Sequence, residues 1–206
     1  MKLVVFGSTG KTGLEIVKQS LAQGFEVTAF LRDPSRMPFT NDRLQCIAGD
    51  VLNLMDVQKA VQKPDAVICA LGTNSLAKTT IRSEGTANII TAMNDQQIKR
   101  LVVISAMGVA ESWPTLSFIN KLFFAILLRN TRLDHEKQEA LVKKSGLDWT
   151  IVRPSGLTDT SVTGVYATGE NIRAVTSKIA RADVAHFILK ELLDNANIRK
   201  AVTITH

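Results

Sequence analysis

The sequence predicts one α/β domain built on a doubly wound parallel sheet. Short apolar segments alternate with helix-period patterns along most of the chain. A Gly-rich turn joins the first of these segments to the first helical pattern. The chain has 206 residues and 45% hydrophobic content, enough for one sizeable core. In such sheets ligands bind outside the carboxyl ends of the strands, so the residues directly after each strand are the first functional candidates.

The expected elements follow one another without an internal repeat or a linker. Strands are expected at residues 3–6, 25–31, 44–48, 66–71, 101–105 and 148–152, and helices at 14–21, 54–62, 84–94 and 181–193. Residues 1–206 are therefore expected to form one dinucleotide-binding unit of the Rossmann type, with a small C-terminal substrate lobe.

The glycine turn is the first candidate site. Gly7, Gly10 and Gly13 are spaced G-x-x-G-x-x-G between the first strand and the first helix. Glycine lets the backbone approach a pyrophosphate, whose charge then lies on the unpaired N–H groups of the helix N-terminus. Candidate cofactor-binding residues here are Gly7, Thr9, Gly10, Lys11 and Thr12. The competing P-loop pattern requires a glycine five residues before Gly10, where Val5 stands, so a nucleotide triphosphatase is disfavoured.

The end of the second strand indicates which cofactor is used. An NAD-selective site usually has an acidic residue here, which binds the ribose 2′-hydroxyl. In this chain Arg32 occupies that position and Arg36 follows one turn later. Two guanidinium groups suit a 2′-phosphate, which predicts NADPH rather than NADH. There are two alternatives to a phosphate-binding role for these arginines. Asp33 can pair with either of them, or the segment can be a solvated turn.

The ends of the next three strands supply further candidates. Asp50, followed by Val51, either accepts from an adenine amino group or caps the helix that begins near residue 54. The backbone at Leu71, Gly72 and Thr73 is expected to approach the cofactor ribose. Ser105 follows the fifth strand, where the nicotinamide is expected, although a serine there can instead cap local backbone.

Composition narrows the class of partner. The net charge is +6, but the basic residues are scattered and aromatic residues make up 5%, so no nucleic-acid surface is indicated. A modest positive field suits a phosphorylated cofactor or an anionic substrate. Cys46 and Cys69 lie in strand-like segments and are expected to be buried thiols rather than a disulfide or redox pair. Three histidines without a Cys/His cluster argue against a metal site.

The start of the chain bears on location. Gly7 interrupts the first apolar segment, so no signal-peptide core is recognised and a cytoplasmic protein is expected. A monomer is expected rather than an oligomer.

Several motifs occur in an order that resembles a known family. They are the glycine turn, L-R-D-x-S-R, G-D-V, L-G-T, S-E-G-x-x-N at 83–88, S-G-L-D-W-T-I-V-R-P at 145–154 and S-K-I-A-R-A-D-V-A at 177–185. Over nearly the whole chain this series resembles the atypical short-chain dehydrogenases with an NAD(P)H-binding fold, and most closely their flavin and biliverdin reductase branch. The resemblance implies hydride transfer from NADPH to a planar heteroaromatic acceptor. FMN, another flavin or a biliverdin-type tetrapyrrole would be a substrate and not a tightly bound cofactor.

The resemblance also implies residue roles. Ser105 matches an active-site serine, and His135, in the helix before the sixth strand, matches a histidine of the cofactor region; otherwise such a histidine is usually solvated. The family has a second histidine after the sixth strand, in a P-P-H stretch, whereas this chain has Pro154 followed by Ser155. A hydroxyl thus replaces an imidazole that could donate a proton. Arg153 is expected to pair with an acidic group or to match the family's structural arginine.

The chain lacks the Tyr-x-x-x-Lys pair of catalytic residues found in ordinary short-chain dehydrogenases. Tyr166 is the only tyrosine, and Glu170 occupies the position where that motif has its lysine. Alcohol–ketone chemistry then lacks its general base, whereas a reductase that works by stacking and alignment does not need one. A catalytically idle NADP(H)-sensing protein is the main alternative. An isomerase that uses NADP as a scaffold has no supporting base.

Two segments are expected to surround the acceptor. Residues 116–128 are apolar on almost every side but too short for a membrane span, which favours a buried or lid helix over an oligomer contact or membrane-surface docking. Residues 158–173 are rich in Gly, Thr and Ser and suit a mobile substrate loop. Residues 106–135 and 154–180 are therefore expected to be lid and substrate-loop insertions.

Overall fold

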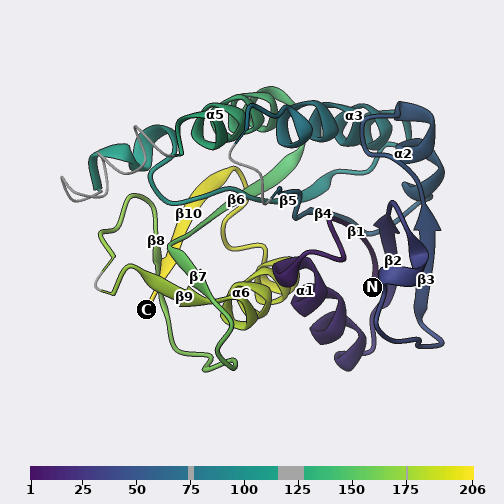
Figure 1. The fold of residues 1–206 in the computed structure, drawn as a ribbon, viewed down its shortest axis with the longest axis horizontal. Coiled ribbons are helices and arrows are strands. Elements are labelled where there is room, and N and C mark those ends of the chain that lie inside the picture. The colour runs from purple at the N-terminus through teal and green to yellow at the C-terminus, as the bar shows by residue number, and fades with distance from the viewer. Residues whose placement is uncertain (74–76, 116–127, 175) are drawn as a thin grey trace.

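An eight-stranded sheet runs through the centre of the computed structural model, which describes residues 1–73, 77–115, 128–174 and 176–206 (Figure 1). The strand order is β3-β2-β1-β4-β5-β6-β10-β8. All neighbouring strands are parallel except β8, which is antiparallel to β10. The strands are β1 (Lys2–Phe6), β2 (Glu26–Leu31), β3 (Leu44–Ala48), β4 (Ala66–Cys69), β5 (Arg100–Ile104), β6 (Asp148–Pro154), β8 (Ala167–Gly169) and β10 (Lys200–Thr205). The predicted α/β fold class is confirmed.

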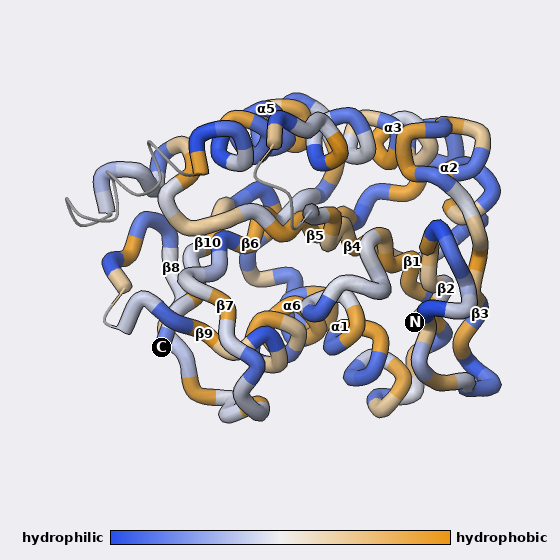
Figure 2. The backbone as a smooth tube through the Cα atoms, viewed as in Figure 1, coloured by the Kyte–Doolittle hydropathy of each residue, from blue (hydrophilic) through white to orange (hydrophobic). Residues whose placement is uncertain are grey.

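Helices cover both faces of the sheet. They are α1 (Lys11–Ala22), α2 (Leu54–Ala60), α3 (Ile81–Asp95), α5 (Arg129–Lys144) and α6 (Arg181–Asp194), with short 3₁₀ turns η1 (Pro34–Arg36) and η2 (Ala110–Thr115). Helix α1 packs on α6 on one face, and α3 packs on α2 and α5 on the other (Figure 1). Figure 2 shows hydrophobic residues concentrated along the central strands between these layers. Two buried apolar clusters, one against each helix layer, form the core.

The strand order reverses beside β1, whose neighbours are β2 and β4. The chain builds outward from β1 to β3 in one direction and from β4 to β6 in the other. The carboxyl ends of β1 and β4 therefore flank the switch point, where open α/β sheets bind ligands.

Four strands were not among the expected elements. The three-residue strands β7 (Gly156–Thr158) and β9 (Lys178–Ala180) form a separate two-stranded sheet, and β8 lies inside the expected 158–173 loop. Three residues are too few to show a period of two. Strand β10 has six residues, but apolar residues alternate with threonine only over its last four, 202–205, which is a weak signal in the sequence. The small lobe formed by β7 and β9 lies beside β8 and α6 (Figure 1).

A carboxylate from α5 caps the N-terminus of α3. Thr80, at the N-cap position of that helix, makes no side-chain cap. Instead Asp134 accepts from the backbone N–H groups of Arg82 and Ser83, each at 3.1 Å, and from the Ser83 hydroxyl at 2.6 Å. Negative charge is favourable at this end of a helix. This contact explains the serine of the S-E-G-x-x-N motif.

The rest of that motif positions two loops at the switch point. A Cβ on Gly85 would lie 2.8 Å from a methyl group of Leu71 and 3.0 Å from the side chain of Val51. The Asn88 amide donates to the Val51 carbonyl at 2.9 Å. A glycine and an amide on α3 thereby hold the loops after β3 and β4 against one helix face.

A buried arginine joins β6 to α5 and η2. Arg153 is 1% exposed and donates to Glu139 through Nε at 2.9 Å and Nη2 at 2.5 Å. It also donates to Glu111 at 2.6 Å, and Lys143 contacts both carboxylates. Lys143, followed by Arg153, holds the pKa of Glu111 down at about 2. The expectation that Arg153 pairs with an acidic group is confirmed.

The cysteine expectation was wrong for one residue. Cys69 is buried and Cys46 is exposed, and neither forms a disulfide. Strand β3 is the edge strand of the sheet, and its residues are half-buried or exposed. An apolar sequence pattern cannot distinguish such an edge strand from a central one.

The described helices contain none that is both long and apolar enough to cross a bilayer. The apolar segment 116–128 lies outside the described residues except for Leu128, so the lid-helix expectation is not examined by this structure.

Removing the Glu139 charge should destabilise the fold. Glu139→Gln keeps the shape of the side chain but leaves the fully buried Arg153 without its main counter-charge, which typically costs about 3–5 kcal/mol of unfolding free energy. Chemical denaturation measures this cost. Asp194→Asn is the control, because the Asp194–Lys190 pair is exposed to solvent and its loss should change the unfolding free energy far less. Equal losses in the two variants would contradict a structural role for the buried pair.

Candidate functional site

A large cleft of about 1510 Å³ lies at the carboxyl ends of the central strands. Every residue predicted from the sequence to be catalytic or cofactor-binding lines it: Gly7, Thr9, Gly10, Lys11, Thr12, Arg32, Arg36, Asp50, Val51, Leu71, Gly72, Thr73, Ser105, His135, Pro154 and Ser155. The structure thus brings together residues spread over nearly 150 positions, while the role of each as a binding or catalytic group stays a prediction.

The glycine turn is built by close backbone contacts. Gly7 has φ +79°, and a Cβ there would lie 2.3 Å from the carbonyl oxygen of Ala70. A Cβ on Gly13 would lie 2.1 Å from the carbonyl oxygen of Gly7. The Ser8 hydroxyl donates to the Phe30 carbonyl at 3.0 Å and ties the turn to β2. Only glycine at positions 7 and 13 allows the turn, β4 and α1 to meet.

The N-terminus of α1 opens into this cleft without an internal cap. Gly10 is its N-cap residue, no side chain accepts from the first turn, and that turn contains no acidic residue. The free N–H groups and the helix dipole favour an anion at this end. Lys11 adds a positive charge at the same place, although its Nζ contacts Asp159 at 2.5 Å.

Two arginines lie at the end of β2. Arg32 and Arg36 are exposed, line the cleft, and form no ion pair within the described part of the chain. The alternative that Asp33 pairs with either arginine was wrong, because it forms no ion pair with them. Its carboxylate accepts from the backbone N–H of Ser35 at 3.0 Å and from its hydroxyl at 2.7 Å, and these bonds lower its pKa, which the charge of Arg36 helps to lower as well. Both guanidinium groups are therefore available to a ligand.

The loop after β3 shows that Asp50 does not cap α2. Asn53 is the cap, since its side chain accepts from the N–H of Met55. Asp50 accepts from the N–H of Leu52 at 3.0 Å in a local turn. The capping alternative was therefore wrong, and the interaction of Asp50 with an adenine stays a prediction.

Gly72 leaves the wall of the cleft open after β4. A Cβ built on it would meet only a guanidinium nitrogen of Arg82, at 3.7 Å. No contact within the described part of the chain therefore requires a glycine here. A ligand bound close to this backbone would require one, because a side chain would occupy its space.

His135 is buried and electrically neutral. The alternative that its side chain is solvated was wrong, because the residue is only 7% exposed. Burial, and then the charge of Arg82, lower its pKa to about 4. Gln138 donates its amide N–H to Thr86 at 3.0 Å, so its Oε1 accepts from Nδ1–H of His135 at 3.2 Å. The imidazole Nε2 is then the unprotonated nitrogen.

The two serines predicted as catalytic have buried hydroxyl groups without a protein partner. Ser105 and Ser155 are 4% and 7% exposed, and no acceptor or donor in the described part of the chain satisfies either Oγ. Their backbone N–H groups extend the strand pairing to Val152 and Ile204, at 2.8 and 3.0 Å. Ser105 therefore does not cap local backbone. A buried unsatisfied hydroxyl is costly and is typical of a site that binds a ligand.

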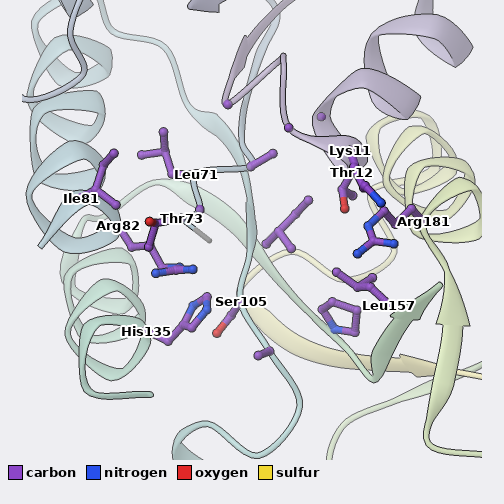
Figure 3. Close-up of a pocket in the computed structure, with 18 of the residues that line it drawn as sticks. Lys11, Thr12, Leu71, Thr73, Ile81, Arg82, Ser105, His135, Leu157 and Arg181 are labelled. Carbon is purple, nitrogen blue, oxygen red and sulfur yellow. The ribbon is translucent and has the colours of Figure 1, made fainter. Parts of the chain in front are cut away.

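Sequence reasoning missed three arginines of the cleft. Arg82, Arg173 and Arg181 line it together with Lys11, Arg32 and Arg36, against one carboxylate, Asp50. This imbalance favours an anionic ligand. Figure 3 shows Arg82 beside His135 and Ser105, and Lys11 with Arg181 on the other side of the cavity. No spacing in the sequence marks these arginines, because Arg82 and Arg181 lie on helices and Arg173 on a loop whose places at the cleft depend on the fold.

Asp159 links the two cations on the second side. Its carboxylate contacts Lys11 through one oxygen and Arg181 through the other, each at 2.5 Å. The chain after β7 is thereby joined to the first turns of α1 and α6.

The isolated tyrosine lies away from the cleft. The Tyr166 hydroxyl bonds His186 Nδ1 at 2.8 Å and does not line the cavity. It therefore cannot stand in for the tyrosine of an alcohol dehydrogenase.

Comparisons with known proteins agree with this geometry. A family model described as NAD(P)H-binding matches residues 7–195. An uncharacterised chloroplast protein of Arabidopsis thaliana is 31% identical, over 98% of this chain and 76% of its own length. The anaerobilin reductase ChuY of Escherichia coli O157:H7 has the same fold, with TM-score 0.82, 24% identity and coverage of 100% and 97% of the two chains. A short-chain dehydrogenase/reductase of Veillonella parvula, solved with NADP, has TM-score 0.81 and 16% identity over 100% and 94%.

The neutral His135 makes stability depend on pH. The unfolded histidine binds a proton below about pH 6.5 and the folded one only below about 4. Stability from this residue is therefore fully present above pH 6.5 and is lost as the pH falls to 4, by about 3 kcal/mol. Denaturation at several pH values should show this slope in the wild type and lose it in His135→Gln. The same slope in both proteins would contradict the burial of an uncharged imidazole.

Proposed function

Because the chain belongs to the NAD(P)H-binding family, we propose that it is an atypical short-chain dehydrogenase/reductase that uses NADPH to reduce planar heteroaromatic acceptors. A flavin such as FMN or a biliverdin-type tetrapyrrole is the proposed acceptor. The observation that carries this proposal is the cleft itself, which combines an uncapped helix N-terminus, two unpaired arginines and two unsatisfied serine hydroxyls.

The residues present fit the cofactor. The first turn of α1 and Lys11 suit a diphosphate, and Arg32 with Arg36 suit a 2′-phosphate through planar guanidinium groups. Gly72 leaves room that no protein atom fills. We therefore assign the 2′-phosphate end of NADPH to the β2 side of the cleft and its reactive end to the β5 side.

The bound cofactor would supply the hydride, and the chain aligns the reactants and excludes water. Ser105 and Ser155 are hydrogen-bonding groups at the reactive end, where they can orient a carboxamide or the acceptor. His135 presents an unprotonated Nε2, so it accepts a hydrogen bond and does not deliver a proton at neutral pH. The proton that completes the reduction is then taken from solvent.

Two findings support a planar acceptor in place of an alcohol. The described cleft contains no tyrosine and no Tyr-Lys pair to act as a general base. The fold neighbour from Escherichia coli is described as an anaerobilin reductase, which makes a tetrapyrrole a reasonable probe.

The segments proposed as lid and substrate loop reach this cleft. Pro114 and Thr115 line it from the 106–135 segment, and Leu157, Arg173 and Ser177 line it from the 154–180 segment. The single-domain organisation, the monomeric state and the cytoplasmic location expected from the sequence stay predictions.

Turnover tests the proposed function directly. Oxidation of NADPH is followed by the loss of its absorbance after FMN or biliverdin is added to the purified protein. Enzyme-dependent oxidation with either acceptor is the expected result. Tight NADPH binding without turnover on any acceptor would overturn the reductase assignment and favour an NADP(H)-sensing protein.

Cofactor selection should depend on the β2 arginines. Arg32→Ala, and Arg32→Ala with Arg36→Ala, remove charge-assisted bonds to the 2′-phosphate, each typically about 1.5–3 kcal/mol. The Kd for NADPH should rise at least about tenfold, while the Kd for NADH, which lacks this phosphate, should change little. Calorimetric titration measures both constants. Arg43→Ala, an exposed arginine outside the cleft, is the control; parallel weakening of NADPH and NADH would refute the assignment.

A further inference from the structure

Arg82 is a buried cation whose hydrogen-bonding capacity the fold does not use. It is the second residue of α3, and its side chain is 7% exposed. Burial lowers its pKa, and the nearby Asp134 opposes that change. A guanidinium group carries five N–H donors and stays protonated in proteins. Placing such a group out of water is costly unless its donors are satisfied.

The one carboxylate beside Arg82 is already engaged. Asp134 forms an ion pair with Arg82 at 3.7 Å from Nη1, too long for a hydrogen bond. Its two oxygens accept three bonds from the backbone N–H groups of Arg82 and Ser83 and from the Ser83 hydroxyl. Among the residues that the structure describes, none is a hydrogen-bond partner of Arg82 Nε or Nη1. Asp134 caps α3 through backbone groups, so the helix does not need this guanidinium.

The guanidinium faces the reactive end of the cleft. Figure 3 shows it pointing into the cavity on the side of His135 and Ser105, and its charge contributes to the lowered pKa of His135. The Ser105 hydroxyl is unpartnered as well. The groups that suit the diphosphate, Lys11 and the first turn of α1, lie on the other side of the cavity.

We propose that Arg82 binds a carbonyl oxygen of the acceptor ring and stabilises the negative charge that reduction places on it. The proposal rests on the proposed function and narrows its substrate class to conjugated carbonyl acceptors, such as the imide of a flavin ring or the lactam of a tetrapyrrole. Arg82 donates from its guanidinium group, which lines the cleft, and the Ser105 hydroxyl supplies a neighbouring donor.

Hydride transfer to such an acceptor places a negative charge on its carbonyl oxygen. The C–H bond of the dihydronicotinamide breaks and a new bond to hydrogen forms at an electron-poor atom of the acceptor. The displaced electron pair moves through the conjugated ring to the carbonyl oxygen held by Arg82. A proton from solvent then neutralises the anion. The acceptor gains two electrons, and the dihydronicotinamide loses them.

Kinetics with two flavins test where Arg82 acts. In Arg82→Ala, kcat should fall at least about tenfold with riboflavin and with FMN alike, because both have the same ring. The Kd for NADPH should stay within about twofold. Added guanidinium ion at a sub-denaturing concentration should restore part of kcat, which a merely structural defect would not allow. Arg199→Ala, an exposed arginine outside the cleft, is the control.

Three results would overturn the proposal. A loss confined to FMN would assign Arg82 to the anionic phosphate tail, and a matching loss of NADPH affinity would assign it to the cofactor. The proposal would also be contradicted if kcat fell in Arg82→Ala, guanidinium ion did not restore it, and the unfolding free energy of the variant were normal. If Arg82→Ala does not fold, Arg82→Lys is tested instead. It keeps the positive charge but loses the planar guanidinium group, so its kcat should fall with both flavins.

A binding measurement separates this proposal from the proposed function. Riboflavin reduced chemically carries negative charge on its ring when deprotonated, so the NADP⁺-loaded wild type should bind it at least about tenfold tighter than oxidised riboflavin. Arg82→Ala should lose this preference. If the preference is present but the wild type shows no turnover, the reductase assignment fails and the role of Arg82 stands. If the wild type shows no preference, the role of Arg82 fails.

Discussion

The close approach of the β1–α1 turn to the end of β4 is the constraint on which the whole site depends. Gly7 lies against the Ala70 carbonyl and Gly13 against Gly7, at separations that leave no room for a Cβ. Gly85 does the same for α3 and the loops at Val51 and Leu71. These contacts bring separate loops of a parallel sheet to one edge. The backbone N–H groups of α1 and the side chains that follow each strand then face one cavity.

Polar networks behind the cavity fix its reactive end. Asp134 caps α3, and Gln138, bonded to Thr86, sets the tautomer of His135. The Arg153–Glu139 pair joins β6 to α5 and continues to η2 through Glu111. Among the unsatisfied buried groups of the described residues, Arg82, Ser105 and Ser155 line the cleft, whereas Arg100, Arg132 and Thr203 do not. We propose that the partners of the first three come from a ligand.

The fold class and the candidate residues that follow each strand could be read from the sequence because both depend on local patterns, whereas His135 and Ser155 were predicted from the family resemblance. Strand-to-helix turns mark the carboxyl edge, so Arg32 and Ser105 were found by position alone. Arg82 was not, because its place in the cleft depends on how α3 packs against α5. Cys46 was misplaced since an edge strand and a central strand share one apolar pattern. Strands of three residues, such as β8, have no readable period and are defined by their partners.

The central claim is that this cleft binds NADPH with its 2′-phosphate at the end of β2 and its reactive end beside Ser105. A crystal structure of the complex with NADP⁺ tests it most directly. The account predicts the 2′-phosphate within hydrogen-bonding distance of Arg32 or Arg36, the diphosphate on the first turn of α1, and the nicotinamide next to Ser105. A nucleotide bound in the opposite direction, or outside this cleft, would contradict the account.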